Sequence, residues 1–348
     1  MRIATYNVEW FANLFDESGA VMDDQQWSGR HNIRRAEQLD GLARVFNAID
    51  ADAIMVIEAP DGHARRSGGH ALERFAEWAG LRARAAVLGF FSETQQEIAL
   101  LYDPDVLRAH HDPIGDPTGK KGSREAPRFD GVFRLDLNVD GAPDLVRFSK
   151  PPLELEMEAI ASGVRFRMIG VHAKSKAPHG ARKAADVMRI SIDNRRKQLA
   201  QCIWLRARVE EHLSAADPLI VLGDFNDGPG LDEYEKLFGR SGIEIVMGSE
   251  ESEAGAQLAP LIEPHARMVL NQKIGAAPVS ARFWIKQEKR WLSALLDYVM
   301  LSPDLAQKGA TWRIWHPFDD PDCYNDPDLR AALLAASDHF PVTVDLAL

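Results

Sequence analysis

Several apolar, strand-like segments of this 348-residue chain end in acid, amide or imidazole side chains. These ends are Thr5-Tyr6-Asn7, Val56-Ile57-Glu58, Gly170-Val171-His172, Gly223-Asp224-Phe225-Asn226 and Ser337-Asp338-His339, with Leu296-Asp297-Tyr298 as a further partner. Burying such groups is costly unless they are paired or bind a metal. One cluster of this kind could be a capped turn. The repetition of the pattern predicts instead that the strand ends share a polar site.

Strand-like and helical segments alternate along the chain, with no linker long enough to separate domains. Residues 31–49 place apolar side chains on one helical face, and residues 183–213 predict one long helix or two. Consecutive strands are expected at 131–138, 144–149, 153–160 and 164–171, an arrangement that favours antiparallel pairing. Further strands are expected near 3–8, 53–57, 82–88, 98–102, 218–222, 282–286, 295–301 and 341–346. This order predicts an α/β fold in a single domain over residues 1–348.

Composition sets broad limits on function. With 45% hydrophobic and 27% charged residues the chain resembles an ordinary globular protein. It has no apolar run near the roughly 20 residues of a membrane span, so we expect no membrane association. Only two cysteines, Cys202 and Cys323, are present, which favours a reducing cytoplasm over a disulfide framework. The net charge of −11 argues against nucleic-acid binding over the whole surface but allows a local basic groove.

The polar clusters supply the groups that phosphodiester hydrolysis needs: a positioned water, a base and stabilisation of phosphoryl charge. Glu58, at the end of an apolar strand, is the candidate principal metal ligand, because Mg²⁺ prefers oxygen ligands. His339 has a side chain whose ordinary pKa suits base catalysis near neutrality. Asp224 and Asn226 are two residues apart, so in an extended segment they would face the same scissile phosphate.

The order of these clusters and their flanking residues resemble the endonuclease/exonuclease/phosphatase superfamily, the pancreatic-deoxyribonuclease-like metal phosphodiesterases. The resemblance runs from Asn7 to His339, and residues 235–285 are the part that does not align. It implies a four-layer sandwich of two packed mixed or antiparallel β-sheets flanked by helices. It also implies Mg²⁺, with Mn²⁺ as a substitute, and in-line attack by a water that a histidine activates.

The resemblance assigns the metal and the base. It places Asn7 and Asp338 beside the metal that Glu58 binds, although Asn7 could also simply form a turn. It makes His339 the general base and gives Asp297 the role of orienting the imidazole. Each of these residues is therefore a candidate for the reacting centre.

The resemblance also assigns the contacts to the phosphate and the leaving group. Asp224 would align the nucleophile or protonate the leaving group, and Asn226 would hold a phosphate oxygen. His172 is typical of pancreatic-type and many bacterial nucleases, whereas apurinic-site nucleases and exonuclease III relatives lack it. In pancreatic-type enzymes a glutamate pairs with this histidine. Glu97 lies in the matching place, although the spacing could shift the role to Glu93.

Two positions depart from the family pattern. Ile57 precedes the metal glutamate where the superfamily usually has glutamine. Lys150 stands where an arginine usually contacts a phosphate, and lysine keeps the charge but lacks the bidentate fork. Lys150 is therefore a candidate phosphate contact.

Basic residues follow His172 in an unusual run. They are Lys174, Lys176, His179, Arg182 and Lys183, then Arg189, Arg195, Arg196 and Lys197. The loop 174–183 leaves the catalytic strand directly, so Lys174 and Lys176 are candidate contacts to a phosphate backbone. Residues 189–197 could instead be a solvated helix face. We therefore expect a nuclease that acts on DNA in preference to RNA. The alternatives are a phosphatase or phosphodiesterase of inositol phosphates or lipid head groups, and an inactive scaffold.

Overall fold

The computed structural model describes residues 1–348 except 64, 93, 95, 137–142, 178–183, 229–238, 249–258, 272–275 and 286–288. Within this described part, two large sheets dominate the fold. The first contains, in spatial order, β14 (Thr311–Ile314), β15 (Val342–Asp345), β1 (Arg2–Asn7), β2 (Ala53–Ala59), β4 (Glu97–Tyr102) and β3 (Ala85–Leu88). The second contains β13 (Asp297–Leu301), β10 (Leu219–Asp224), β9 (Arg165–His172), β8 (Leu153–Ala159) and β5 (Leu107–His111). Each sheet has one parallel pair, β1 with β2 and β9 with β10, and is otherwise antiparallel.

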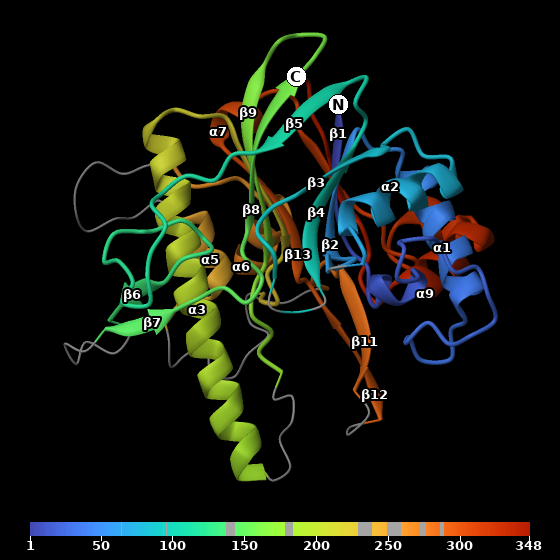
Figure 1. Ribbon diagram of the computed structural model, residues 1–348, viewed down its shortest axis with the longest axis horizontal. Helices are drawn as coiled ribbons and strands as arrows, with labels where there is room; N and C mark the ends of the chain where they lie inside the picture. The colour runs from blue at the N-terminus through green and yellow to red at the C-terminus, as the bar shows by residue number, and fades with distance from the viewer. Residues whose placement is uncertain are drawn as a thin grey trace.

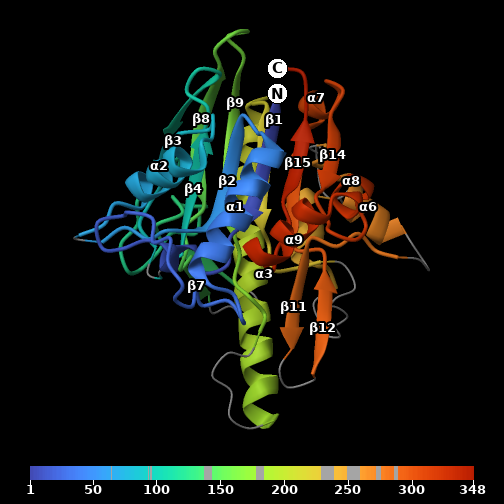
Figure 2. The same cartoon turned by 90° about the vertical axis from the view of Figure 1, so that its right-hand side faces the viewer.

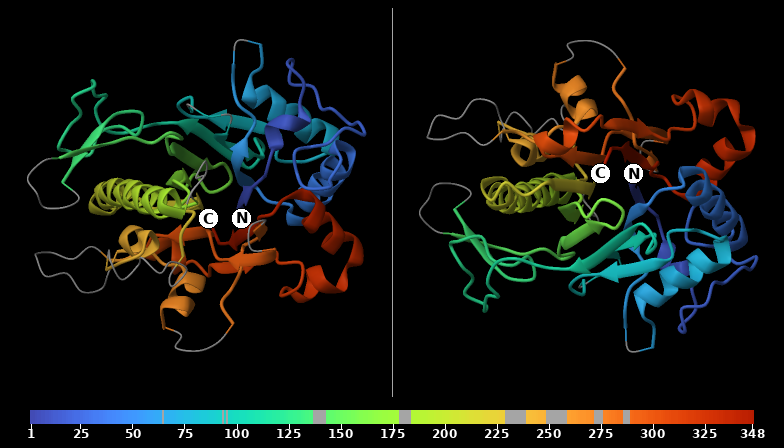
Figure 3. Two further views of the ribbon diagram at one scale, coloured as in Figure 1. Left: turned by 90° about the horizontal axis from the view of Figure 1, so that it is seen from below. Right: turned by 90° about the horizontal axis from the view of Figure 1, so that it is seen from above.

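Helices cover the outer face of each sheet, which gives four layers (Figures 1 and 2). Over the six-stranded sheet lie α1 (Arg35–Ile49), α2 (Gly68–Ala79), α9 (Pro327–Ala336) and the short η1 (Phe11–Leu14). Over the five-stranded sheet lie α3 (Ala184–Ser214), α5 (Gly242–Met247) and α6 (Pro264–Asn271). The short helices α7 (Pro303–Ala306) and α8 (Pro321–Asn325) complete the described set. Seen from above and below, α3 lies on one side of the sheets and α1, α2 and α9 on the other (Figure 3).

Side chains alternate between the inter-sheet core and the helical layers, as strand geometry requires. Ile3 and Met55 pack between the sheets, whereas Tyr6 and Val56 pack against the helices. The sheets approach closely at Gly170, where a Cβ would lie 2.4 Å from the sulfur of Met55. A larger residue at Gly170 would therefore require the side chain of Met55 to move. Glycine at this position therefore leaves room for Met55 in the layer between the sheets.

The structure confirms the α/β class and the packed sheets, and it refines the expected elements. The segment expected at 183–213 is one helix, α3, and the helix expected from residue 31 begins at Arg35. The four strands expected between 131 and 171 are present and pair antiparallel in twos, but they do not form one sheet, because β6 (Phe133–Leu135) and β7 (Asp144–Val146) form their own hairpin while β8 pairs with β9. Pro151 and Pro152 separate that hairpin from β8, since proline lacks the N–H that a sheet interior needs. A second hairpin joins β11 (Ala281–Ile285) to β12 (Arg290–Ala294).

Among the residues that the structure describes, every helix is too short or too polar to cross a lipid bilayer.

A buried ion pair away from the strand ends supports the fold. Arg208 of α3 donates to Glu154 of β8 and, at 3.1 Å, to the carbonyl oxygen of Pro127. Both charged side chains are almost fully buried, and burial raises the pKa of Glu154 to about 7 although Arg208 opposes the shift. The pair therefore replaces the hydration that both groups lose.

Arg208→Leu is expected to lower the free energy of unfolding by about 3–5 kcal/mol, because it leaves Glu154 buried without its partner. The raised pKa of Glu154 means that the native state holds this proton more tightly than the unfolded chain. The stability that this bound proton contributes is therefore lost as pH rises from the ordinary carboxyl pKa of 4.5 through about 7. Urea unfolding of the variant should show a larger deficit at about pH 8 than at about pH 5. An equal deficit at both values would contradict the assignment to Glu154.

Candidate active site

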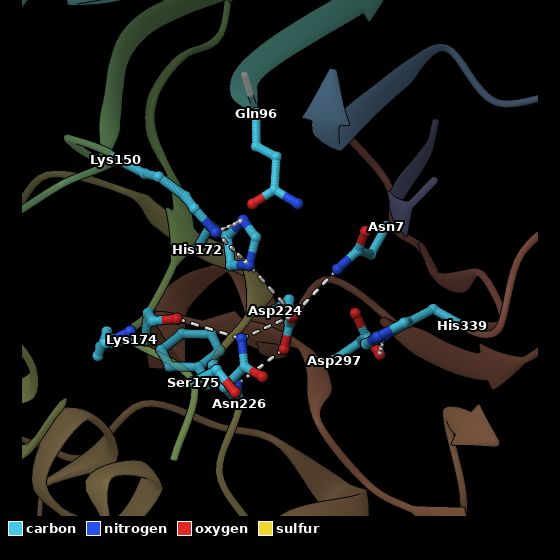
Figure 4. Close-up of polar contacts among 12 residues, drawn as sticks. Asn7, Gln96, Lys150, His172, Lys174, Ser175, Asp224, Asn226, Asp297 and His339 are labelled. Carbon is cyan, nitrogen blue, oxygen red and sulfur yellow. Dashed lines mark hydrogen bonds and ion pairs between the residues drawn. The ribbon is translucent and has the colours of Figure 1, made fainter. Parts of the chain in front are cut away.

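Strand ends from both sheets meet at one end of the molecule (Figure 4). The parallel pairing of β1 with β2 brings Asn7 and Glu58 to the same edge, and that of β9 with β10 places His172 beside Asp224. The amide of Asn7 donates to Oδ2 of Asp224 at 3.0 Å. Because Asn7 belongs to one sheet and Asp224 to the other, this bond joins the two sheets at the site.

A histidine–aspartate pair lies beside Asp224. Nδ1 of His339 donates to Oδ2 of Asp297 at 2.8 Å. The hydroxyl of Ser280 also donates to this oxygen at 2.8 Å and accepts the backbone N–H groups of Leu296 and Asp297. Ser280 therefore fixes the carboxylate that holds the imidazole. With Nδ1 committed to Asp297, Nε2 is the nitrogen of His339 left to meet a water or a substrate.

The electrostatics of this group favour protonated histidine. Burial disfavours the imidazolium, but the charge and hydrogen bond of Asp297, reinforced by Asp224, raise the pKa of His339 well above its ordinary value. Burial raises the pKa of Asp224 to about 6, with His339 acting in the opposite direction. Asp224, Asp297 and His339 each place one ligand atom within 4.8 Å of the others. A cation near these acids would offset their charge and lower the pKa of the imidazole.

The end of β10 and the residues that follow it adopt an unusual backbone conformation. Gly223 has φ +139°, and a Cβ there would lie 2.0 Å from the carbonyl oxygen of Val171. Asn226 has φ +50°, in the left-handed region that non-glycine residues seldom adopt. Its backbone N–H and side-chain amide both donate to Asp224, at 2.7 and 3.0 Å. Such strain persists only where surrounding contacts impose it.

Asp227 supplies those contacts. Its buried carboxylate accepts from Lys176 at 2.7 Å, from Arg195 at 2.8 Å and from the backbone N–H of Gly242. The predicted phosphate contact Lys176 is therefore already engaged by an acid. Lys176 therefore helps to fix this loop, and its contact with a phosphate stays a prediction.

Glu58 occupies a bulge. The pairing of β2 with β4 shifts register between Ile57 and Ala59, and Glu58 between them has φ +61°. Burial raises its pKa to about 7, Lys150 and His339 act against this shift, and Asp338 adds to it. A carboxylate under these conditions is stabilised by a nearby cation. The bulge re-aims this side chain out of the regular strand pattern.

The oxygen donors near Glu58 fit a hard divalent ion. Oδ1 of Asn7 is buried and has no hydrogen-bond partner within the described residues. Glu58 and Asp338 add carboxylate oxygens that sense each other electrostatically. Oxygen-only ligands of this kind suit Mg²⁺ or Mn²⁺.

His172 has partners other than the expected one. Nζ of Lys150 lies 3.0 Å from its Nε2, and Oδ2 of Asp224 lies 3.6 Å from the same nitrogen. Burial, reinforced by Lys150, lowers the pKa of His172 well below its ordinary value. The carboxylate of Glu97 instead accepts the backbone N–H of Ser92, and burial raises its pKa to about 7.

Gln96 is the neighbouring side chain drawn beside Lys150 and His172 in Figure 4. The expected pairing of His172 with Glu97 is thus not what the geometry shows, and a catalytic role for Glu97 stays a prediction. Glu93, the alternative, lies outside the described residues. Burial lowers the pKa of Lys150 to about 8, so this ammonium remains available as a positive charge near neutral pH.

Two supporting residues were not expected from the sequence. Ser280 has no local signal, because it lies 17 residues before the aspartate that it holds. Glu9 follows β1 and forms an ion pair with Arg30, and burial together with Asp338 raises its pKa to about 7. Ser337 of the Ser337-Asp338-His339 motif donates to the carbonyl oxygen of Asn7 at 2.7 Å and so connects β1 to the segment before β15.

A basic pocket of about 530 Å³ continues from the site along α3. Its cationic side chains are Arg147, Lys174, Arg196 and Lys197. Asp144 and Asp193 offset part of this charge. Ser149, next to Lys150, also lines the pocket and links it to the strand ends. The predicted residues His179, Arg182 and Lys183 fall outside the described residues.

The Endonuclease/Exonuclease/phosphatase family model matches residues 4–339 of the chain. The chain belongs to this family. Members of the family hydrolyse phosphoester bonds. No curated protein matches the sequence.

Among solved structures, the human Nocturnin catalytic domain with bound sulfate anion is 14% identical, over 100% of this chain and 94% of that one, with a TM-score of 0.49. An AP endonuclease from Archaeoglobus fulgidus is 10% identical over 100% of both chains, with a TM-score of 0.49. A mannosyl-6-phosphatase from Bacteroides thetaiotaomicron is 13% identical over 100% of both chains, with a TM-score of 0.48.

Proposed function

We propose that this protein is a divalent-metal-dependent phosphodiesterase, a nuclease that acts on DNA in preference to RNA, with residues 1–348 forming one catalytic domain. The observation that carries the proposal is the His339–Asp297 pair at 2.8 Å, placed beside Asp224 and next to a basic pocket. A base, an acid and a cationic path for a phosphate backbone then share one end of the fold. Family membership supports phosphoester hydrolysis.

In the proposed mechanism His339 reacts in its neutral form, and its Nε2 takes a proton from the attacking water. Asp297 keeps the ring oriented and stabilises the imidazolium that forms. Asp224 aligns the water or gives a proton to the leaving oxygen, and its pKa of about 6 allows either protonation state near neutrality. The side-chain amide of Asn226 donates to Asp224 and to the carbonyl oxygen of Ala173, and it would exchange one of these bonds for a phosphate oxygen of the substrate.

Positive charge that can stabilise the phosphoryl group comes from the side of Asp224 away from His339 (Figure 4). Lys150 presents an ammonium group that neutralises a phosphoryl oxygen, and neutral His172 supports it. Glu58, Asn7 and Asp338 are the residues that would hold Mg²⁺. When bound, that ion stabilises the developing charge on the phosphoryl oxygens. We place the protein in the cytoplasm, because both cysteines are free and buried.

Salt dependence tests the nucleic-acid substrate. Replacing Lys174, Arg196 and Lys197 together with Ala should shallow the slope of log binding constant against log salt, because fewer counterions are released from DNA. The KM for DNA should rise, whereas hydrolysis of bis(p-nitrophenyl) phosphate should stay nearly unchanged because the reacting groups remain in place. Fluorescence anisotropy with labelled DNA at several salt concentrations measures the slope.

Lys308→Ala with Arg165→Ala is a control that removes two positive charges elsewhere, since both residues are exposed and Arg165 begins β9 at the end opposite His172. The slope should not change in this control. Parallel assays with RNA, an inositol phosphate and a sphingolipid test the alternatives. If the wild type with Mg²⁺ or Mn²⁺ leaves DNA and RNA intact yet hydrolyses a lipid or inositol phosphate, the nuclease proposal is wrong.

A further inference from the structure

The hairpin of β11 and β12 extends from the sheets at the end that carries the active site, as does the N-terminal half of α3 (Figures 1 and 2). Its base is bonded directly to the catalytic segments. The backbone N–H of Arg282 donates to the carbonyl oxygen of Asp338 at 2.7 Å, and Ala281 pairs with His339. Ser280, just before the hairpin, holds Asp297. The hairpin is therefore fixed relative to the reacting groups.

One face of this hairpin carries exposed aromatic rings. Trp284 and Trp291 are paired across the strands with ring centroids 5.5 Å apart, and their exposed fractions are 44% and 51%. The opposite face of the hairpin is partly buried, because Phe283 packs against the small cluster of Ala281, Ala294 and Leu296. The hairpin therefore buries the face that carries Phe283 and leaves the face that carries the two tryptophans exposed.

A guanidinium group adds positive charge to this aromatic face. Arg282 lies 4.3 Å from the ring centroid of Trp291 and 5.4 Å from that of Phe318, which is itself 44% exposed. Alternate residues of a strand share a face, so Ser280, Arg282 and Trp284 lead outward from the catalytic pair in sequence. Four extended residues place Trp284 roughly 13 Å beyond Ser280.

We propose that Trp284, Trp291 and Arg282 form a stacking site for an unpaired nucleobase of the substrate strand. This inference rests on the proposed nuclease function and specifies its substrate as single-stranded polynucleotide near the cleavage point. Aromatic rings stack on any base, and an adjacent arginine attracts the phosphate that accompanies it. A base inside a duplex has both faces covered by its neighbours, so it cannot occupy this site without unstacking.

The test compares Trp284→Ala, Trp291→Ala and the double variant with the wild type on three substrates. These are oligothymidylate, the same strand annealed to oligoadenylate, and bis(p-nitrophenyl) phosphate. The double variant should raise KM for oligothymidylate about tenfold or more, since stacking on an aromatic side chain contributes that much per base. Duplex cleavage should change less, and hydrolysis of the small diester should not change.

Two further variants exclude a purely structural role. Trp78→Ala removes a ring that is 42% exposed on α2 and should leave all three activities unchanged. Trp284→Phe with Trp291→Phe keeps flat rings and should retain most of the affinity for oligothymidylate. A cross-strand tryptophan pair also stabilises a hairpin. If that were its whole role, the Ala variants would lose activity on the small diester as well, which would overturn the proposal.

The two proposals fail in different ways. If the wild type cleaves oligothymidylate and the double Ala variant does so with the same KM, the stacking site is wrong and the nuclease function stands. If the wild type cleaves no polynucleotide but hydrolyses another phosphoester, the nuclease function is wrong and the stacking site with it.

Discussion

His339→Ala should lower kcat by at least about 10²–10⁴-fold, the range that a positioned general base contributes. Asp297→Asn should lower kcat through the same step, because the amide no longer fixes the imidazole that Nδ1 anchors at 2.8 Å. The two changes disable one unit, so the double variant should be little worse than His339→Ala alone. Steady-state kinetics with bis(p-nitrophenyl) phosphate measures all three without requiring nucleic-acid binding.

The chain contains a matched control for this experiment. His212 and Asp217 form a histidine–aspartate pair at the same distance, 2.8 Å, at the end of α3 remote from the site. His212→Ala should keep wild-type kcat. Near-wild-type turnover of His339→Ala would remove this histidine from the mechanism. A similar loss in His212→Ala would show that the effect is on folding.

Glu58→Gln should abolish tight binding of Mn²⁺ and lower kcat by roughly 10²-fold or more. Removing a residue that only supports a metal ligand already costs 10–100-fold in affinity or activity, and Glu58 is proposed as the ligand itself. Isothermal titration with Mn²⁺ gives a readout that does not depend on turnover. In an Mn²⁺-soaked crystal, the anomalous peak should lie beside Glu58 in the wild type and be absent in the variant.

Glu154→Gln controls for the loss of a buried glutamate. Burial raises the pKa of Glu154 to about 7, as it does for Glu58, but Glu154 lies in an ion pair with Arg208 away from the strand ends. This variant should lose stability and keep its affinity for Mn²⁺. An anomalous peak at Asp224 and Asp297, with Glu58 empty, would contradict the proposed ligand set.

The sequence predicts the fold where a local pattern is strong. The apolar run ending at Glu58 predicts β2, and the long periodic segment 183–213 predicts α3. The strands β5 and β14 were not predicted, because Leu107–His111 and Thr311–Ile314 mix charged and apolar residues and form edge strands. Pairing with a neighbour in space, not the pattern along the chain, determines such strands.

The sequence predicts the site residues with the same limitation, because it does not show which of them meet in space. A motif predicts which residues end a strand but not which atoms meet across 217 positions, as those of Asn7 and Asp224 do. Lys176 illustrates the problem, because its sequence neighbours are basic whereas its partner in space is the acid Asp227. Glu97 is similar, because its neighbour Gln96 lies beside His172 (Figure 4), whereas the carboxylate of Glu97 accepts the backbone N–H of Ser92. Distances of this kind depend on how the two sheets dock.

The bond between Asn7 and Asp224 makes the active site a joint between the two sheets. The six-stranded sheet and the segment before β15 carry the proposed metal ligands and His339, whereas the five-stranded sheet carries Asp224 and Asp297. The complete site therefore exists only while the layer of Met55 and its neighbours is tightly packed. An expanded state that kept its strands but loosened this layer would retain secondary structure and lose chemistry. Activity in this protein should therefore depend on how the two sheets are aligned, and a change that shifts one sheet against the other should lower catalysis.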